Sequence, residues 1–141
     1  MLVETMKKYY DKKYDLNCAE CILTATNEEY DLDVPKKAIK SMAAFGGGMG
    51  IGSVCGAITG AIAALGIMFA EDRGHASPQV KEMTVELISN FNEKLGSMDC
   101  IQLKEMYYEN QEYRCIKMME IAAISLEEII NKNKDKYEVY R

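Results

Sequence analysis

The sequence has little positive charge. Its 141 residues include 17 lysines and arginines against 22 aspartates and glutamates, so the formal net charge at pH 7 is −5. A protein that binds DNA or RNA through the phosphates presents a basic face. Here the basic pairs, such as Lys7–Lys8 and Lys36–Lys37, lie among acidic residues. We therefore expect no nucleic-acid partner.

A secretory signal pattern is missing from residues 1–15, because charged residues interrupt the stretch before an apolar segment can form. This predicts a cytoplasmic protein, in a compartment that keeps thiols reduced. The chain has five cysteines. In such a compartment they favour a catalytic, redox or metal-binding role over a framework of structural disulfides, and their odd number favours the same conclusion.

Several other patterns are absent. No segment alternates like a β-strand, and no internal repeat or low-complexity linker interrupts the chain. The single histidine, His75, falls in a polar loop, where we do not expect a metal ligand. One Cys-x-x-Cys segment, Cys18–Cys21, is present without a second, which weakens a zinc-ribbon interpretation. No strand precedes it, so a thioredoxin-type fold is not supported either.

Apolar residues recur at helical spacing along most of the chain. Asn17 and Glu20 match a capping box, Pro78 suits a first helical turn, and Gly96 suits a helix end. We predict one all-α domain over residues 1–141, a bundle of about six helices around a central small-residue helix at 54–70. The candidate helices are 2–13, 18–30, a short one after Pro35, 54–70, 78–95, a short one from 100, and 110–131.

Residues 43–70 hold eight of the ten glycines and no charged residue. Glycine within a helix costs roughly 1 kcal/mol relative to alanine, so Gly56, Gly60 and Gly66 predict close packing of another helix. That helix could belong to the same chain or to a second subunit, so a homo-oligomer is one of two outcomes. Only about 17 residues remain for continuous helix after the glycine turn, so we favour a buried helix over a membrane span. We expect no membrane partner.

Three cysteines stand where a helix begins. They are Cys18 after Asn17, Cys55 two residues after Ser53, and Cys100 after Asp99. The first turn of a helix offers unpaired N–H groups and roughly half a positive charge, which favours a thiolate over a thiol. We therefore expect these helix ends to converge on Cys55, and we hypothesise that Cys55 is a nucleophile of low pKa.

The central segment contains the motif Cys55-Gly56-Ala57-Ile58-Thr59-Gly60, preceded by Gly-Gly-Gly-Met-Gly. With Cys18 before it and Cys100 and Cys115 after it, the motif resembles the C_GCAxxG_C_C family of redox-active proteins. The resemblance covers residues 17 to about 130, and it implies a small domain with redox chemistry but names no substrate. Cys21 lies outside the four-cysteine pattern, either as a resolving thiol for Cys18 or as a core residue.

We thus predict a redox site made of Cys18, Cys55, Cys100 and Cys115, in which one of the other cysteines resolves Cys55 as a disulfide. The pairing stays open, as do the substrate and the redox partner. The clustered cysteines would serve dithiol–disulfide or electron-transfer chemistry. The enzyme class that corresponds to the first is thiol–disulfide oxidoreductase, and the cofactor stays open, with none as one outcome. In the alternative interpretation, the same four cysteines are ligands of an iron–sulfur cluster or another soft metal.

Overall fold

A computed structural model describes all 141 residues of the chain. It is 72% helical, with seven α-helices and no β-strand. The helices are α1 (Leu2–Tyr10), α2 (Cys18–Tyr30), α3 (Lys36–Lys40), α4 (Gly56–Phe69), α5 (Pro78–Leu95), α6 (Cys100–Tyr107) and α7 (Ile116–Asn133). The prediction of an all-α fold is confirmed, and each of the seven candidate helices has a counterpart in the structure.

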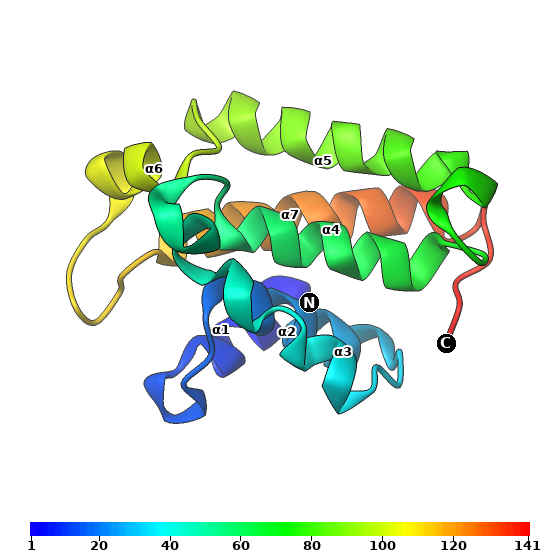
Figure 1. Ribbon diagram of the computed structural model, residues 1–141, viewed down its shortest axis with the longest axis horizontal. Coiled ribbons are helices and arrows are strands. Elements are labelled where there is room, and N and C mark those ends of the chain that lie inside the picture. The colour runs from blue at the N-terminus through cyan, green and yellow to red at the C-terminus, as the bar shows by residue number, and fades with distance from the viewer.

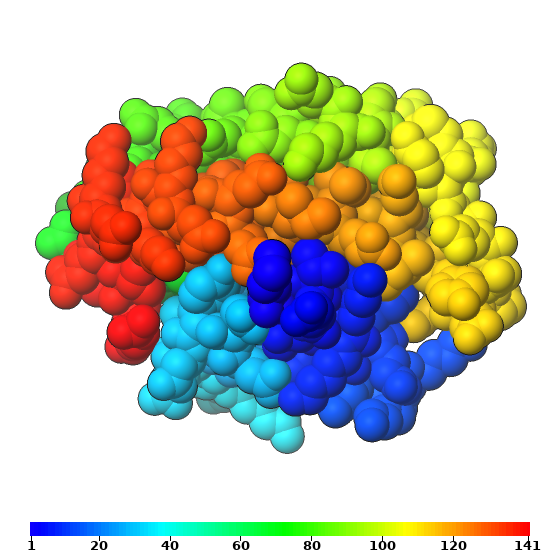
Figure 2. All heavy atoms as spheres, turned by 180° about the vertical axis from the view of Figure 1, so that it is seen from behind, coloured from blue at the N-terminus to red at the C-terminus, as the bar shows by residue number.

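Helix α4 packs against α2, α5 and α7. Figure 1 shows α5 along one side of α4 and α1 to α3 gathered on the other, with α6 near the end at which α4 begins. Seen from behind, α7 crosses the molecule between α5 and α1 (Figure 2). One hydrophobic core joins these elements. No helix has both the length and the apolar composition that a membrane crossing needs.

Two glycines explain how closely α2 approaches α4. A Cβ atom on Gly60 would overlap the Ile22 side chain and lie 2.5 Å from the Ala19 carbonyl oxygen. On Gly56, a Cβ would lie 3.1 Å from the Cβ of Cys18. The groove predicted from the small residues is therefore filled by α2 of the same chain. Gly66 has no atom within 4 Å of its Cβ position, so close packing does not explain that glycine.

The glycine-rich segment before α4 forms a tight turn, Gly48–Gly52, closed by a 2.9 Å hydrogen bond from the Ser53 N–H to the Gly48 carbonyl. Gly48, Gly50 and Gly52 adopt positive φ angles of 63°, 76° and 71°, which glycine reaches at little cost. A Cβ on Gly48 would also lie 2.6 Å from the Cβ of Cys100. The turn thus needs glycine both for its backbone and for the approach of Cys100.

Several predicted helix bounds are wrong. The first helix ends at Tyr10, and a separate turn, Lys12–Tyr14, follows it. The central helix begins at Gly56 instead of residue 54, because Val54 pairs with Asp99 in an isolated antiparallel bridge. Neither Ser53 nor Asp99 caps a helix with its side chain. By contrast, the Asn17–Glu20 capping box and the left-handed Gly96 that ends α5 are present as predicted.

The last helix begins at Ile116 instead of about residue 110. The Asn110 side chain accepts hydrogen bonds of 2.9 Å from the backbone N–H groups of Glu112 and Tyr113, which holds this segment in a turn. Arg114 then adopts a φ of +47°, which a helix cannot include. As a result, Cys115 precedes the helix instead of lying within it.

Candidate cysteine site

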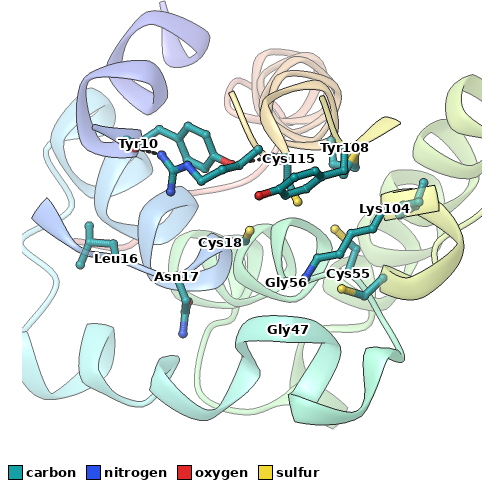
Figure 3. A pocket seen from close by; sticks show the side chains of 14 residues that line it. Tyr10, Leu16, Asn17, Cys18, Gly47, Cys55, Gly56, Lys104, Tyr108 and Cys115 are labelled. Atoms are coloured by element: carbon teal, nitrogen blue, oxygen red, sulfur yellow. Dashed lines mark hydrogen bonds between the residues drawn. The ribbon is translucent and has the colours of Figure 1, made fainter. Parts of the chain in front are cut away.

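Four of the five cysteines lie at the N-terminal ends of four different helices. Cys18 and Cys100 are the first residues of α2 and α6, whereas Cys55 and Cys115 directly precede α4 and α7. All four line one pocket of about 280 Å³ (Figure 3). The structure therefore brings together the four cysteines that the sequence selected, and it adds Cys115 to the set of helix-start cysteines.

Cys21 lies outside this pocket. Its side chain is buried, and its Sγ lies 3.6 Å from the carbonyl oxygen of Met6, to which the thiol donates a hydrogen bond. Burial raises the pKa of Cys21 to about 12. Of the two roles left open for Cys21, this position fits a core residue between α1 and α2.

Cys55 and Cys100 are held close by backbone contacts on either side of the Val54–Asp99 bridge. The N–H of Cys55 donates a 2.9 Å hydrogen bond to the Met98 carbonyl, and the N–H of Cys100 donates a 2.6 Å bond to the Ser53 carbonyl. Both N–H groups stand at helix starts, where a helix leaves them without an internal partner. The bridge thus satisfies these donors and fixes two thiols at one wall of the pocket.

Cys115 is held from the other side by Tyr10, the last residue of α1. The Tyr10 hydroxyl accepts a 2.8 Å hydrogen bond from the N–H of Cys115. Arg114 donates a 2.6 Å bond to the Tyr10 carbonyl, and its guanidinium lies over the Tyr10 ring, 4.1 Å from the ring centre. This packing brings Cys115 to the pocket that Cys18 also lines, where each thiol affects the pKa of the other.

The thiols of Cys18 and Cys115 differ in acidity. The hydrogen bond from Cys18, helped by the positive charges of Lys104 and Arg114, lowers the pKa of Cys115 to about 7 although burial opposes the shift. The same hydrogen bond and burial raise the pKa of Cys18 well above its ordinary value. Cys115 is therefore the more acidic thiol of the two, and Cys18 keeps its proton near neutral pH.

The expectation of a low pKa at Cys55 is wrong. Burial raises the pKa of Cys55 to about 11, although hydrogen bonds from the backbone N–H groups of Ala57 and Ile58 act in the opposite direction. A thiolate at this position loses its hydration, and two N–H groups do not replace it. The pKa of Cys100 is also raised by burial, against the charge of Lys104. The helix ends alone do not make these thiols acidic.

The lining of the pocket contains two cations, Lys104 and Arg114, and no acidic residue. None of the seven ion pairs in the structure includes either side chain. Lys104 extends from α6 across the pocket toward Cys18 and Cys55 (Figure 3). The remaining lining residues are Tyr10, Leu16, Asn17, Gly47, Gly56, Leu103, Tyr108 and Met118.

Sequence reasoning did not select Lys104 or Arg114, although both leave a signal. Lys104 lies four residues after Cys100 on a predicted helix, so the two share a face. Arg114 directly precedes Cys115. Tyr10 has no comparable signal, because only the packing of α1 against α7 brings it to residue 115.

The positions of the four cysteines bear on their alternative role as metal ligands. Four cysteines are the usual ligand set of iron–sulfur clusters, so the donor chemistry fits in kind. A single zinc ion needs thiolates about 2.3 Å from one common point. No three Cys, His, Asp or Glu side chains are arranged closely enough to hold a metal ion. The side-chain positions therefore do not fit a single-ion site.

Comparison with family models gives one match, to a family described as "Putative redox-active protein (C_GCAxxG_C_C)" over residues 16–129. This range covers most of the chain and includes the four cysteines of the pocket. No curated protein and no solved structure matches the chain.

Proposed function

The chain belongs to the C_GCAxxG_C_C family, and we propose that it acts as a thiol–disulfide oxidoreductase whose reactive pair is Cys18 and Cys115. One observation carries the proposal: the four helix-start cysteines line one pocket. The choice of pair follows from the opposite directions in which Cys18 and Cys115 shift each other's pKa. A compartment that keeps thiols reduced, such as the cytoplasm expected from the sequence, would supply the dithiol form from which this reaction starts.

In the proposed reaction, the Cys115 thiolate attacks one sulfur of a substrate disulfide. The substrate S–S bond breaks, a mixed disulfide forms on Cys115, and the first substrate sulfur leaves as a thiolate. Cys18 then attacks the sulfur of Cys115, and the proton of Cys18 passes to the first leaving thiolate. The second substrate thiolate leaves as the Cys18–Cys115 disulfide forms. Two electrons have then passed to the substrate, and a dithiol reductant restores the protein.

Cys115 suits the role of nucleophile better than Cys55 does. A thiol with a pKa of about 7 is half ionised at neutral pH, whereas Cys55 with a pKa of about 11 is almost entirely protonated. The optimum attacking thiol has a pKa near the ambient pH. Cys18 suits the resolving role because it lines the same pocket as Cys115, and hydrogen bonding between the two thiols is the largest influence on the pKa of each.

Cys55 and Cys100 form a second pair in this proposal. The backbone contacts beside the Val54–Asp99 bridge hold them on one wall, and both keep their protons at neutral pH because burial raises the pKa of each. Exchange with the Cys18–Cys115 disulfide would oxidise Cys55 and Cys100 and return the first pair to thiols. All four cysteines predicted from the sequence thus keep a redox role.

Disulfide mapping tests the assignment of the pair. The fully reduced protein is treated with one equivalent of a small disulfide, free thiols are blocked with an alkylating reagent, and cross-linked peptides are identified by mass spectrometry. We expect the Cys18–Cys115 disulfide as the first product, and its loss in Cys115→Ser. Cys21→Ala is the matched control and should leave this product unchanged. A first product that joins Cys18 to Cys21, or no internal disulfide at all, would contradict the proposal.

A second candidate function is an iron–sulfur protein, and the four cysteines around one pocket are the observation that favours it. Anaerobic purification followed by a visible spectrum and by iron, sulfide and zinc determination separates the two functions. Stoichiometric metal that is lost in Cys55→Ser would overturn the dithiol mechanism. A colourless protein that carries no metal and forms the Cys18–Cys115 disulfide would support it.

A further inference from the structure

We propose that the cysteine pocket selects small disulfides that carry negative charge, such as disulfides with carboxylate groups. This inference rests on the proposed function and adds the class of substrate. It is drawn from the access to the thiols and from the charge of the pocket lining, which are separate observations.

Access to the thiols limits the size of the substrate. Cys55, Cys100 and Cys115 are only 5%, 8% and 9% exposed, and they are reached through a pocket of about 280 Å³. That volume is at the lower end of the range for small-molecule sites. An attacking thiolate must meet the substrate S–S bond in line, so both substrate sulfurs must enter the pocket. A small disulfide can enter whole, whereas a disulfide in the surface of a folded protein would remain outside.

The charge of the lining favours an anion. Lys104 and Arg114 line the pocket, neither forms an ion pair, and no acidic residue belongs to the lining. The Nε atom of Arg114 is buried and has no hydrogen-bond partner. These two cations without an acidic partner occur in a chain whose net charge is −5. The pocket is therefore a local positive region on an acidic protein, which attracts anionic ligands.

The same two cations serve the reaction itself. When the Cys115 thiolate attacks, negative charge passes to the departing sulfur of the substrate as its S–S bond breaks. A nearby ammonium or guanidinium stabilises that charge for any substrate. For a substrate with carboxylates, the cations also hold the molecule before attack, so the reaction rate should depend on substrate charge.

Three aliphatic disulfides of similar length test this dependence: 3,3′-dithiodipropionate with two negative charges, 2-hydroxyethyl disulfide with none, and cystamine with two positive charges. The rate of Cys18–Cys115 formation is measured with the fully reduced, full-length protein at low and high salt. Each rate is divided by the rate at which the same disulfide reacts with 1-thioglycerol, a small uncharged thiol, and this division removes the intrinsic reactivity of the reagent. We expect the dianion to exceed the dication by about tenfold or more at low salt, and the difference to shrink at high salt.

Lys104→Gln should lower the ratio of the dianion rate to the dication rate severalfold. Loss of this lysine also affects the acidity of Cys115, but that change acts on all three reagents alike and cancels in the ratio. Lys81→Gln is the matched control, because Lys81 is an exposed lysine of α5 outside the pocket and outside every ion pair. It should leave the ratio unchanged.

The outcomes separate this inference from the proposed function. Equal normalised rates for the three reagents, or a faster dication, would overturn the charge selection and leave the oxidoreductase function intact. A faster reaction with a folded protein that carries a surface disulfide would overturn the size limit. Failure of every disulfide to oxidise Cys18 and Cys115 would overturn the proposed function itself.

Discussion

Burial acts on every cysteine of the pocket, and the residues beside each one decide which carries the charge. Cys55 receives two backbone N–H groups, yet burial still raises its pKa to about 11. Cys115 receives a hydrogen bond from Cys18 and the charges of Lys104 and Arg114, and its pKa falls to about 7. Side-chain charge and a neighbouring thiol thus outweigh the helix end. Local sequence patterns indicate where helices begin, but they do not indicate which thiols come close together in the fold.

Substitution of Cys18 should therefore change the acidity of Cys115. Cys18→Ala removes the largest cause of the lowered pKa, so the midpoint of Cys115 alkylation should move from about pH 7 toward the ordinary thiol value near 9. Because a thiolate is the reactive form, the alkylation rate at pH 7 should fall, while the rate at pH 10 should be little affected. The measurement is the pH dependence of iodoacetamide labelling at Cys115, followed by mass spectrometry.

Two further variants test whether the change in Cys115 acidity is due to the Cys18 thiol. Cys18→Ser keeps a hydroxyl donor and should retain part of the shift, because a hydroxyl can also hydrogen-bond the Cys115 thiolate. Cys21→Ala changes a cysteine outside the pocket and should leave the midpoint where it is. If all three variants show the same midpoint as the unmodified protein, Cys18 does not set the acidity of Cys115.

At the level of helices, the motif glycines bring α2 to the site. Gly60 lies against Ala19 and Ile22, and Gly56 lies against Cys18, the first residue of α2. The two glycines of the Gly56-x-x-x-Gly60 spacing, one and five residues after Cys55, therefore allow α2 to pack closely against α4. This part of the fold could be predicted from the sequence, because the cost of glycine in a helix requires a close neighbour. The sequence does not predict which helix that neighbour is.

Gly60→Ala should destabilise the protein. The added Cβ would lie 2.5 Å from the Ala19 carbonyl oxygen, so backbone must move, and overpacking of this kind costs about 1–3 kcal/mol. That cost exceeds the gain of roughly 1 kcal/mol in helix propensity. Urea unfolding should show a lower midpoint. The shift of α2 should also separate Cys18 from Cys115, so the pKa of Cys115 should rise.

Gly66→Ala is the matched control on the same helix. Its Cβ would meet no atom within 4 Å, so only the propensity gain remains, and the variant should be as stable as the unmodified protein or up to about 1 kcal/mol more stable. The alkylation midpoint of Cys115 should not change. A Gly60→Ala protein that matches Gly66→Ala in both measurements would contradict the packing role of Gly60.

Helix ends that depend on local sequence could be predicted, whereas those that depend on tertiary contacts could not. The capping box Asn17–Glu20 and the terminal Gly96 are local patterns, and both are present in the structure. The start of α4 differs from the predicted residue 54 because Val54 pairs with Asp99. These residues are far apart in the chain, so a local pattern does not indicate their contact. Cys115 was placed inside a helix because apolar spacing continues through it, whereas the Asn110 turn delays the helix start. Contacts of this kind depend on tertiary packing.

Across the whole molecule, the proposed Cys18–Cys115 disulfide would join the start of α2 to the start of α7 and enclose most of the chain. A cross-link that closes a loop of about 100 residues stabilises a folded protein by up to about 4.7 kcal/mol in the chain-entropy model, because it restricts the unfolded state. We therefore expect the oxidised protein to unfold at a higher urea concentration than the reduced protein, by an amount equivalent to a few kcal/mol.

The comparison uses urea unfolding of the oxidised and reduced forms, with Cys115→Ser treated in parallel. This variant cannot form the bond, so the same oxidation should leave its midpoint unchanged. A disulfide between Cys18 and Cys21 closes a loop of only a few residues, and its stabilisation would be much smaller. The size of the shift therefore distinguishes a long-range disulfide from one between Cys18 and Cys21. Equal midpoints for the oxidised and reduced forms of the unmodified protein would argue against a long-range bond between α2 and α7.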